Sequence, residues 1–261
     1  KRGNQKIDIL YKDVKSSIEE AVFDRKFQLT CHLRIIHAET KAITYEKGLA
    51  SFVTDKQILI TKGNGNEEII HADYTIIASG SRPRKLPNVN IDEKVIMTSD
   101  GISQLTDFPK SIVIVGAGVI GCEFATIFAN FGKTKVYLID RAKRILPFED
   151  EDVSELISKK MEKLGVVIHR EANLKRIEEK DGMVEYEIEN ESGEVETINV
   201  EKALLSIGRV PNIKSLKIEN AGVSMSKRGV HIGDVDTQTN VSHIYVVGDV
   251  SGHIPLVKRQ C

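Results

Sequence analysis

One glycine-rich loop, Gly116-Ala-Gly118-Val-Ile-Gly121, most constrains the fold of this chain. It follows four consecutive β-forming residues at 112–115 and opens an apolar stretch that predicts a helix ending at Gly132. In that context the first glycine allows a tight turn, the second lets the backbone approach a pyrophosphate, and the third permits close helix–strand packing. The helix N-terminus offers unpaired N–H groups and partial positive charge to the phosphates. The loop therefore predicts a dinucleotide site.

Strand and helix patterns alternate after this loop. Short apolar runs at 136–139 and 166–168 predict buried strands, and a helical pattern lies between them at 150–165. The order β-α-β-α-β within about sixty residues predicts the parallel sheet of a doubly wound α/β half. Two further buried strands are predicted at 203–207 and 244–247, each followed by glycine.

The segments around this core predict simpler structures. Residues 42–80 alternate apolar and polar side chains, which favours a short antiparallel meander, and a linker follows that ends near Pro109. Residues 13–27 predict an exposed helix or a frayed leader. The runs at 184–188 and 195–200 predict a hairpin crossover, because a Glu-Ser-Gly-Glu turn separates them.

An acidic residue follows the second strand of the predicted nucleotide domain. Asp140 stands at roughly the 20-residue spacing expected after the glycine loop. A carboxylate there accepts hydrogen bonds from both adenine-ribose hydroxyls, and a 2′-phosphate beside it would cost about 1–4 kcal/mol, which favours NAD. Arg141, Lys143 and Arg144 follow at once. These three indicate either an NADP site or a solvated loop.

Composition excludes several other classes of function. Lys and Arg number 37 against 38 Asp and Glu, so the net charge of -1 argues against nucleic-acid or membrane-surface binding. No apolar run approaches the roughly 20 residues of a membrane helix. Cys31, Cys122 and Cys261 are widely spaced, which fits a reducing, cytoplasmic compartment, and the histidines predict no metal site. Because Lys1 is not a start methionine, we expect an excerpt.

Four separated segments resemble the pyridine nucleotide–disulfide oxidoreductases. They are TIIASGSRP (75–83), VIVGAGVIGCEFA (113–125), LLSIGRVPN (204–212) and IYVVGDV (244–250). In that family an NAD-binding domain is inserted into an FAD-binding domain. The resemblance implies an α/β fold, with a Rossmann-like, doubly wound NAD-binding domain on a parallel sheet inserted in a partial FAD-binding domain (three-layer β/β/α and α/β).

The resemblance also implies a division of the chain. Residues 1–41 match poorly and form an unassigned leader, while 42–107 would be a partial FAD-domain meander and linker. Residues 108–231 would be the NAD(H)-binding domain, and 232–261 a truncated return to the FAD domain through the Gly-Asp motif. The segment after that motif, SGHIPLVKRQC, departs from the small, Ala-rich helix of the family.

Two sets of binding residues carry over from the family. Glu123 matches a glutamate at the nicotinamide end, or is a plain helix carboxylate. Arg209 borders the nucleotide, or merely ties loops together. Asp249 matches the aspartate that hydrogen-bonds a ribityl hydroxyl of FAD, or is a turn residue. The NAD(H) set is Gly116, Ala117, Gly118, Val119, Ile120, Gly121, Glu123, Asp140, Gly208 and Arg209, and the FAD set is Gly48, Ala50, Ser79, Gly80 and Asp249.

Three family features are not found in this sequence: the first FAD phosphate loop, the redox cysteine pair with four intervening residues, and the dimerisation domain with its His–Glu pair. No catalytic residue is therefore assigned, and Cys122 is interpreted as a buried helix thiol. We therefore expect the chain to be a fragment of an FAD-dependent oxidoreductase that transfers hydride between NAD(H) and flavin. The chain alone is expected to bind NAD(H) but not to turn over.

Two alternatives to a dihydrolipoamide dehydrogenase-like enzyme stay open. GRVPN resembles the dihydrolipoamide dehydrogenases, whereas GCEFATIF and RILPFEDEDVS also resemble the soluble pyridine nucleotide transhydrogenases. A non-catalytic dinucleotide-binding sensor module is the other alternative. The family implies a homodimer for the complete enzyme.

Overall fold

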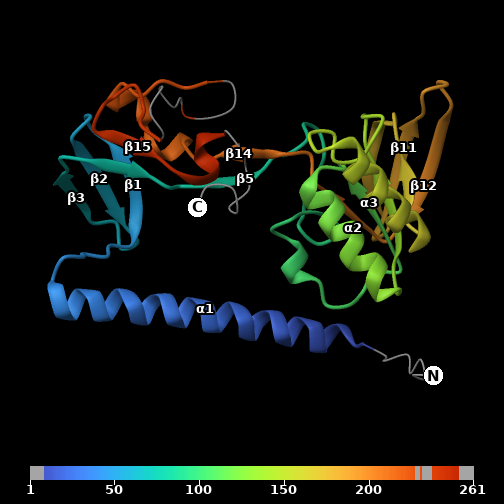
Figure 1. The fold of residues 1–261 in the computed structure, drawn as a ribbon, viewed down its shortest axis with the longest axis horizontal. Helices are drawn as coiled ribbons and strands as arrows, with labels where there is room; N and C mark the ends of the chain where they lie inside the picture. The colour runs from blue at the N-terminus through green and yellow to red at the C-terminus, as the bar shows by residue number, and fades with distance from the viewer. Residues whose placement is uncertain (1–8, 227–229, 231–236, 253–261) are drawn as a thin grey trace. The chain divides into compact units, whose positions relative to one another are not determined.

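The computed structural model describes residues 9–226, 230 and 237–252, and it divides into two compact units (Figure 1). The first unit joins Lys1–His32 to Pro83–Gly208, and the second joins Leu33–Arg82 to Arg209–Cys261. We call them unit 1 and unit 2 and describe each by itself. Both are discontinuous in sequence, because the chain passes from one to the other and back.

Unit 1 is built on a five-stranded sheet in the order β6-β13-β7-β8-β9. Every neighbouring pair in this sheet is parallel, as the predicted β-α-β-α-β order requires. The strands are β6 (Ile96–Thr98), β7 (Ser111–Val115), β8 (Lys135–Ile139), β9 (Val167–His169) and β13 (Lys202–Leu205), and the helices are α2 (Val119–Phe131) and α3 (Glu151–Lys163).

The two faces of this sheet are covered differently. Ile112 and Ile114 pack with Phe128 and other residues of α2 and α3, which lie side by side in Figure 1. Val113 and Val115 point to the opposite face and pack against a three-stranded antiparallel sheet. That second sheet comprises β10 (Asn173–Lys180), β11 (Met183–Glu189) and β12 (Val195–Val200). The Rossmann-like α/β prediction is therefore confirmed, with the hairpin crossover as the second covering layer.

Unit 2 contains the predicted antiparallel meander and two strand pairs. The meander has the order β1-β2-β3, while β4 pairs in parallel with β15, and β5 pairs with β14. Phe52, Ile77 and Ile244 lie in one core that the meander shares with β4 and β15. The strands are β1 (Gly48–Phe52), β2 (Gln57–Lys62), β3 (Glu67–His71), β4 (Thr75–Ile77), β5 (Ser81–Pro83), β14 (Arg209–Pro211) and β15 (Ile244–Val246).

The structure differs from the sequence-based prediction in several places. The predicted linker before Pro109 contains β6, which adds a buried strand to the edge of the unit 1 sheet beside β13. The predicted exposed helix at 13–27 is longer and forms α1 (Tyr11–Thr40), none of whose residues is buried. Four short 3-10 helices complete the fold: η1 (Ile102–Gln104), η2 (Lys214–Leu216), η3 (Ile218–Ala221) and η4 (Gly248–Ser251). Within the described ranges no helix is long and apolar enough to cross a membrane.

Candidate functional site

The glycine loop connects β7 to α2, and packing accounts for two of its three glycines. Gly116 has φ of 101°, a conformation that L residues rarely adopt, and a Cβ there would lie 2.5 Å from the carbonyl oxygen of Ser206. A Cβ on Gly121 would lie 1.9 Å from the carbonyl oxygen of Gly116. Glycine is therefore required at both positions for the loop, the helix and β13 to approach one another.

Packing does not account for the third glycine. Gly118 is the N-cap residue of α2 with φ of -74° and ψ of -172°, an ordinary extended conformation, and no side chain caps the helix there. Beyond its chain neighbours, no described atom lies within 4 Å of the position that a Cβ on Gly118 would take. The helix N-terminus thus opens onto free space with its N–H groups available, which fits a pyrophosphate.

Asp140 fixes the shape of this loop. Its Oδ2 accepts a hydrogen bond of 2.6 Å from the backbone N–H of Ala117, and its Oδ1 accepts one of 2.8 Å from Ala142. A carboxylate oxygen has two acceptor sites, so both oxygens retain capacity for a ribose hydroxyl. The predicted ribose-binding carboxylate is thereby joined to the predicted phosphate loop.

The three basic residues after Asp140 have different surroundings. The Arg144 guanidinium donates hydrogen bonds of 2.9 Å to the carbonyl of Glu149 and 3.3 Å to that of Pro147, so it folds its own loop. Lys143 Nζ lies 3.7 Å from a carboxylate oxygen of Glu171, with 85% of its side chain exposed. Arg141 is exposed. Two of the three basic groups are thus occupied with contacts inside the protein.

Ser206 contacts the glycine loop, although it was not among the predicted site residues. Its hydroxyl lies 2.9 Å from the carbonyl oxygen of Val115 and 2.8 Å from that of Gly116, and its N–H donates to Val115. A polar residue directly after the buried strand β13 is the signal that would have identified it. The N–H of Ser206 and the single proton of its hydroxyl together provide two donors for the carbonyls of Val115 and Gly116 at this sharp turn.

Cys122 and Glu123 lie next to each other near the start of α2 but face different surroundings. Cys122 is 5% exposed, and its thiol donates to the carbonyl of Ala117 at 3.4 Å. Burial, with a smaller contribution from the charge of Asp140, raises the pKa of the Cys122 thiol to about 12. Glu123 is exposed. The structure thus supports Cys122 as a buried thiol and leaves the Glu123 carboxylate accessible.

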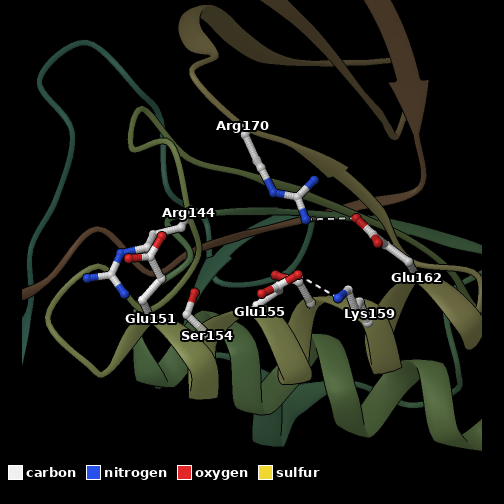
Figure 2. A pocket seen from close by; sticks show the side chains of 8 residues that line it. Arg144, Glu151, Ser154, Glu155, Lys159, Glu162 and Arg170 are labelled. Carbon is white, nitrogen blue, oxygen red and sulfur yellow. Dashed lines mark hydrogen bonds and ion pairs between the residues drawn. The ribbon is translucent and has the colours of Figure 1, made fainter.

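A polar hollow of ≈ 380 Å³ lies along α3 (Figure 2). Its charged groups neutralise one another: Lys159 contacts Glu155 at 2.5 Å, and Arg170 contacts Glu162 at 2.7 Å. None of the predicted binding residues lines it. The lining residues are Arg144, Glu151, Ser154, Glu155, Ser158, Lys159, Glu162 and Arg170. We therefore do not assign the nucleotide to this hollow.

In unit 2, the segment after β4 is joined to Asn212. The Ser79 hydroxyl donates to the carbonyl of Asn212 at 2.7 Å, and the N–H of Asn212 donates to the carbonyl of Gly80 at 3.0 Å. Gly80 has φ of 66°. Gly48 is required by packing, because a Cβ there would lie 2.8 Å from both Ile60 and Thr61 atoms. Ala50, on the same strand, is exposed.

Asp249 lies in η4 and is held from one side only. Its Oδ2 accepts a hydrogen bond of 2.7 Å from the Ser81 hydroxyl and lies 3.6 Å from Nε of Arg209. Its Oδ1 is buried and has no hydrogen-bond partner among the described residues. A buried carboxylate oxygen without a donor is costly, so this atom fits a ligand that donates a hydroxyl, as the ribityl chain of FAD does.

The predicted site residues thus fall into the two units. Residues 116–121, Glu123, Asp140 and Gly208 of the NAD(H) set belong to unit 1, whereas Arg209 belongs to unit 2. All five residues of the FAD set belong to unit 2. Cys31, on α1, is a free thiol, and Cys261 and His253 lie outside the described residues. Within the described ranges, no group of three or more His, Cys, Asp or Glu side chains could hold a metal ion.

Comparison with known proteins places these features in a family. The family model described as "Pyridine nucleotide-disulphide oxidoreductase" matches residues 8–259. A dihydrolipoyl dehydrogenase of Bacillus subtilis (strain 168) is 40% identical over 217 residues, which cover 80% of this chain and 44% of that protein. The chain thus spans less than half the length of this curated relative.

Solved structures agree with this result. The HOCl-induced flavoprotein disulfide reductase RclA from Escherichia coli matches with a TM-score of 0.73 at 28% identity, over 91% of this chain and 53% of that chain. LpdA from Mycobacterium tuberculosis matches with a TM-score of 0.82 at 23% identity, over 97% of this chain and 54% of that chain, a likeness of fold.

Proposed function

Since this chain belongs to the pyridine nucleotide-disulphide oxidoreductase family, we propose that it binds NAD(H) at the glycine loop of unit 1 and contributes FAD-binding residues from unit 2. In the complete enzyme, hydride would pass between NAD(H) and flavin. The substrate would be dihydrolipoamide-like, as the names of the relatives suggest. By itself the chain would bind NAD(H) without turnover. The homodimer and the cytoplasmic location expected from the sequence also stay predictions.

Gly118 is the observation that carries this proposal. The fold itself requires Gly116 and Gly121, but it leaves open space where a side chain on Gly118 would stand. A glycine that packing does not require, at the N-terminus of a helix, keeps that space free for a ligand. The ligand best suited to the space is an anion held by backbone N–H groups, such as a pyrophosphate.

The residues of the chain would bind and orient the cofactors. The N–H groups at 118–121 would hold the pyrophosphate, and Asp140 would accept hydrogen bonds from the adenine ribose. The exposed carboxylate of Glu123 would lie at the nicotinamide end. When bound, NAD(H) and FAD supply the hydride chemistry, and the protein contributes position and electrostatics.

The proposal is tested by titrating the parent chain and the Gly118→Ala variant with NADH, and in parallel with NADPH. Alanine suits the backbone conformation at this position and meets no described atom, so the variant should fold as the parent chain does. Its methyl group would occupy the space assigned to the pyrophosphate. We expect NADH affinity to fall at least about tenfold, the equivalent of one lost charge-assisted hydrogen bond.

Gly63→Ala is the matched control. Gly63 also has ordinary φ and open space around its Cβ position, but it lies in the turn between β2 and β3 of unit 2. The Gly63→Ala variant should bind NADH as the parent chain does. Equal affinity in Gly118→Ala, or no NADH binding by the folded parent chain, would refute the proposed site. Tighter binding of NADPH than of NADH would instead favour the transhydrogenase alternative.

A further inference from the structure

Three residues of unit 2 form a directed chain of hydrogen bonds. Arg209 Nε donates to the hydroxyl of Ser81 at 2.6 Å, and its Nη2 donates to the backbone carbonyl of Ser81 at 2.8 Å. The Ser81 hydroxyl then lies 2.7 Å from Oδ2 of Asp249. Because β5 pairs with β14, Ser81 and Arg209 lie on neighbouring strands, and Asp249 reaches them from η4.

The chemistry of the three groups sets the direction of this chain. A guanidinium can only donate hydrogen bonds, so the oxygen of Ser81 must accept from Arg209. The single proton of the serine hydroxyl is then left to point at Asp249, whose ionised carboxylate only accepts. Two side chains therefore act on Oδ2 of Asp249 from one side, and the carboxylate cannot rotate without losing both contacts.

The other carboxylate oxygen faces a different environment. Oδ1 of Asp249 is buried and has no hydrogen-bond donor among the described residues, and the whole side chain is only 16% exposed. A carboxylate held in this orientation presents one acceptor to a ligand and has no proton to give. Among dinucleotide groups, a hydroxyl of a polyol chain is a suitable partner.

We propose that Ser81 and Arg209 are positioning residues that orient Asp249 so that its Oδ1 accepts a hydrogen bond from a ribityl hydroxyl of FAD. The inference rests on the proposed function, since it requires FAD to bind unit 2. It also gives Arg209 a role on the flavin side, where its contacts lie, in place of the NAD(H) contact that the family resemblance implied.

Titration of the purified chain with FAD, followed by flavin fluorescence, tests this proposal. Ser81→Ala removes the hydroxyl that links Arg209 to Asp249, and Arg209→Lys removes the forked donor. We expect each to weaken FAD binding about tenfold, as the loss of one hydrogen bond to a charged group does. Ser81→Thr retains a hydroxyl and should restore the affinity.

A double-mutant cycle separates positioning from general stability. Asp249→Asn should weaken FAD binding at least as much as Ser81→Ala does. The double variant should bind no more weakly than Asp249→Asn alone, because Ser81 acts only through Asp249. NADH affinity should not change in any variant, which shows that unit 1 stays folded.

Ser242→Ala and Arg34→Lys are matched controls within unit 2. Both side chains are exposed, and both variants should bind FAD as the parent chain does. Unchanged FAD affinity in Ser81→Ala, or strictly additive effects in the cycle, would overturn the positioning role and leave the proposed function intact. A parent chain that binds NADH but not FAD would overturn both this inference and the flavin half of the proposed function.

Discussion

Single residues of the glycine loop have separable tasks. Gly116 and Gly121 permit close packing, and a Cβ on either would collide with backbone atoms. Gly118 leaves space that no described residue fills. Asp140 and Ser206 then hold the loop through the N–H of Ala117 and the carbonyls before it. A change at Asp140 would therefore disturb the loop as well as the ribose site, which makes Gly118→Ala the cleaner test of nucleotide binding.

Cys122 gives a prediction at the same scale. Burial raises the pKa of its thiol to about 12, so at pH 8 only about one thiol in 10⁴ is ionised. Because the thiolate is the reactive form, we expect Cys122 to resist iodoacetamide in the folded chain and to react once the chain is unfolded. Peptide mapping by mass spectrometry after timed labelling measures this directly.

Cys31 is the internal reference for that experiment. It lies partly exposed on α1, and it should be labelled in the folded chain much faster than Cys122. Comparable rates for the two thiols under native conditions would show that the start of α2 opens readily. The helix N-terminus would then not be the rigid anion site that the proposed function requires.

At the scale of elements, the strength of each local pattern decided what the sequence could predict. The long apolar runs of β7 and β8 and the glycine that ends α2 gave the parallel core correctly. β6 has only three residues, too few to show a period, and it is a strand because β13 supplies its hydrogen bonds. β10 was missed for a related reason, since its charged outer face obscures the apolar positions that pack inward.

For the candidate site, the sequence predicted which residues take part better than it predicted their contacts. Motifs identified which residues surround the loop and the Gly-Asp turn, because their spacing reflects local geometry. The contacts of Arg209 and Ser206 were not predictable, since they join segments about 90 to 130 residues apart. Sequence alone left open whether Arg209 contacts nucleotide or ties loops. In the structure it contacts Ser81 and Asp249.

His169, the last residue of β9, gives a pH prediction. Its ring stacks with Tyr137 at 6.3 Å, and its Nε2 is buried without a partner among the described residues. Burial lowers the pKa of His169, and the charge of Glu196 opposes this with a smaller effect. The unfolded chain therefore binds this proton more readily than the folded chain does, so stability should fall as pH drops below about 6.5.

Urea unfolding at pH 7.5 and pH 5.5 measures this effect. His169→Gln removes the titrating group while keeping a polar side chain, so the variant should lose less stability between the two pH values than the parent chain. The difference between the two proteins isolates His169 from the carboxylates that also titrate. An equal or larger loss in His169→Gln would mean that protonation of His169 does not oppose folding.

At the scale of the whole molecule, the two proposed cofactor sites lie one in each unit. The chain leaves unit 2 after Arg82 and returns at Arg209, so the nucleotide loop is held in an inserted unit with its own sheet and core. For this reason, tests of NADH binding and of FAD binding report on different parts of the chain.

The positions of the thiols lead to the last prediction, that the chain binds NADH but does not reduce lipoamide. A disulfide reductase needs two thiols close together, and the described thiols lie on α1 and near the start of α2, where Cys122 is buried. With FAD added, we expect no steady-state NADH oxidation linked to lipoamide. Sustained lipoamide reduction that disappears in Cys122→Ser would contradict this, because it would require the buried thiol to become a redox centre. Reduction of thionicotinamide nucleotide without lipoamide reduction would instead favour the transhydrogenase alternative, since hydride would then pass between nucleotides without any dithiol.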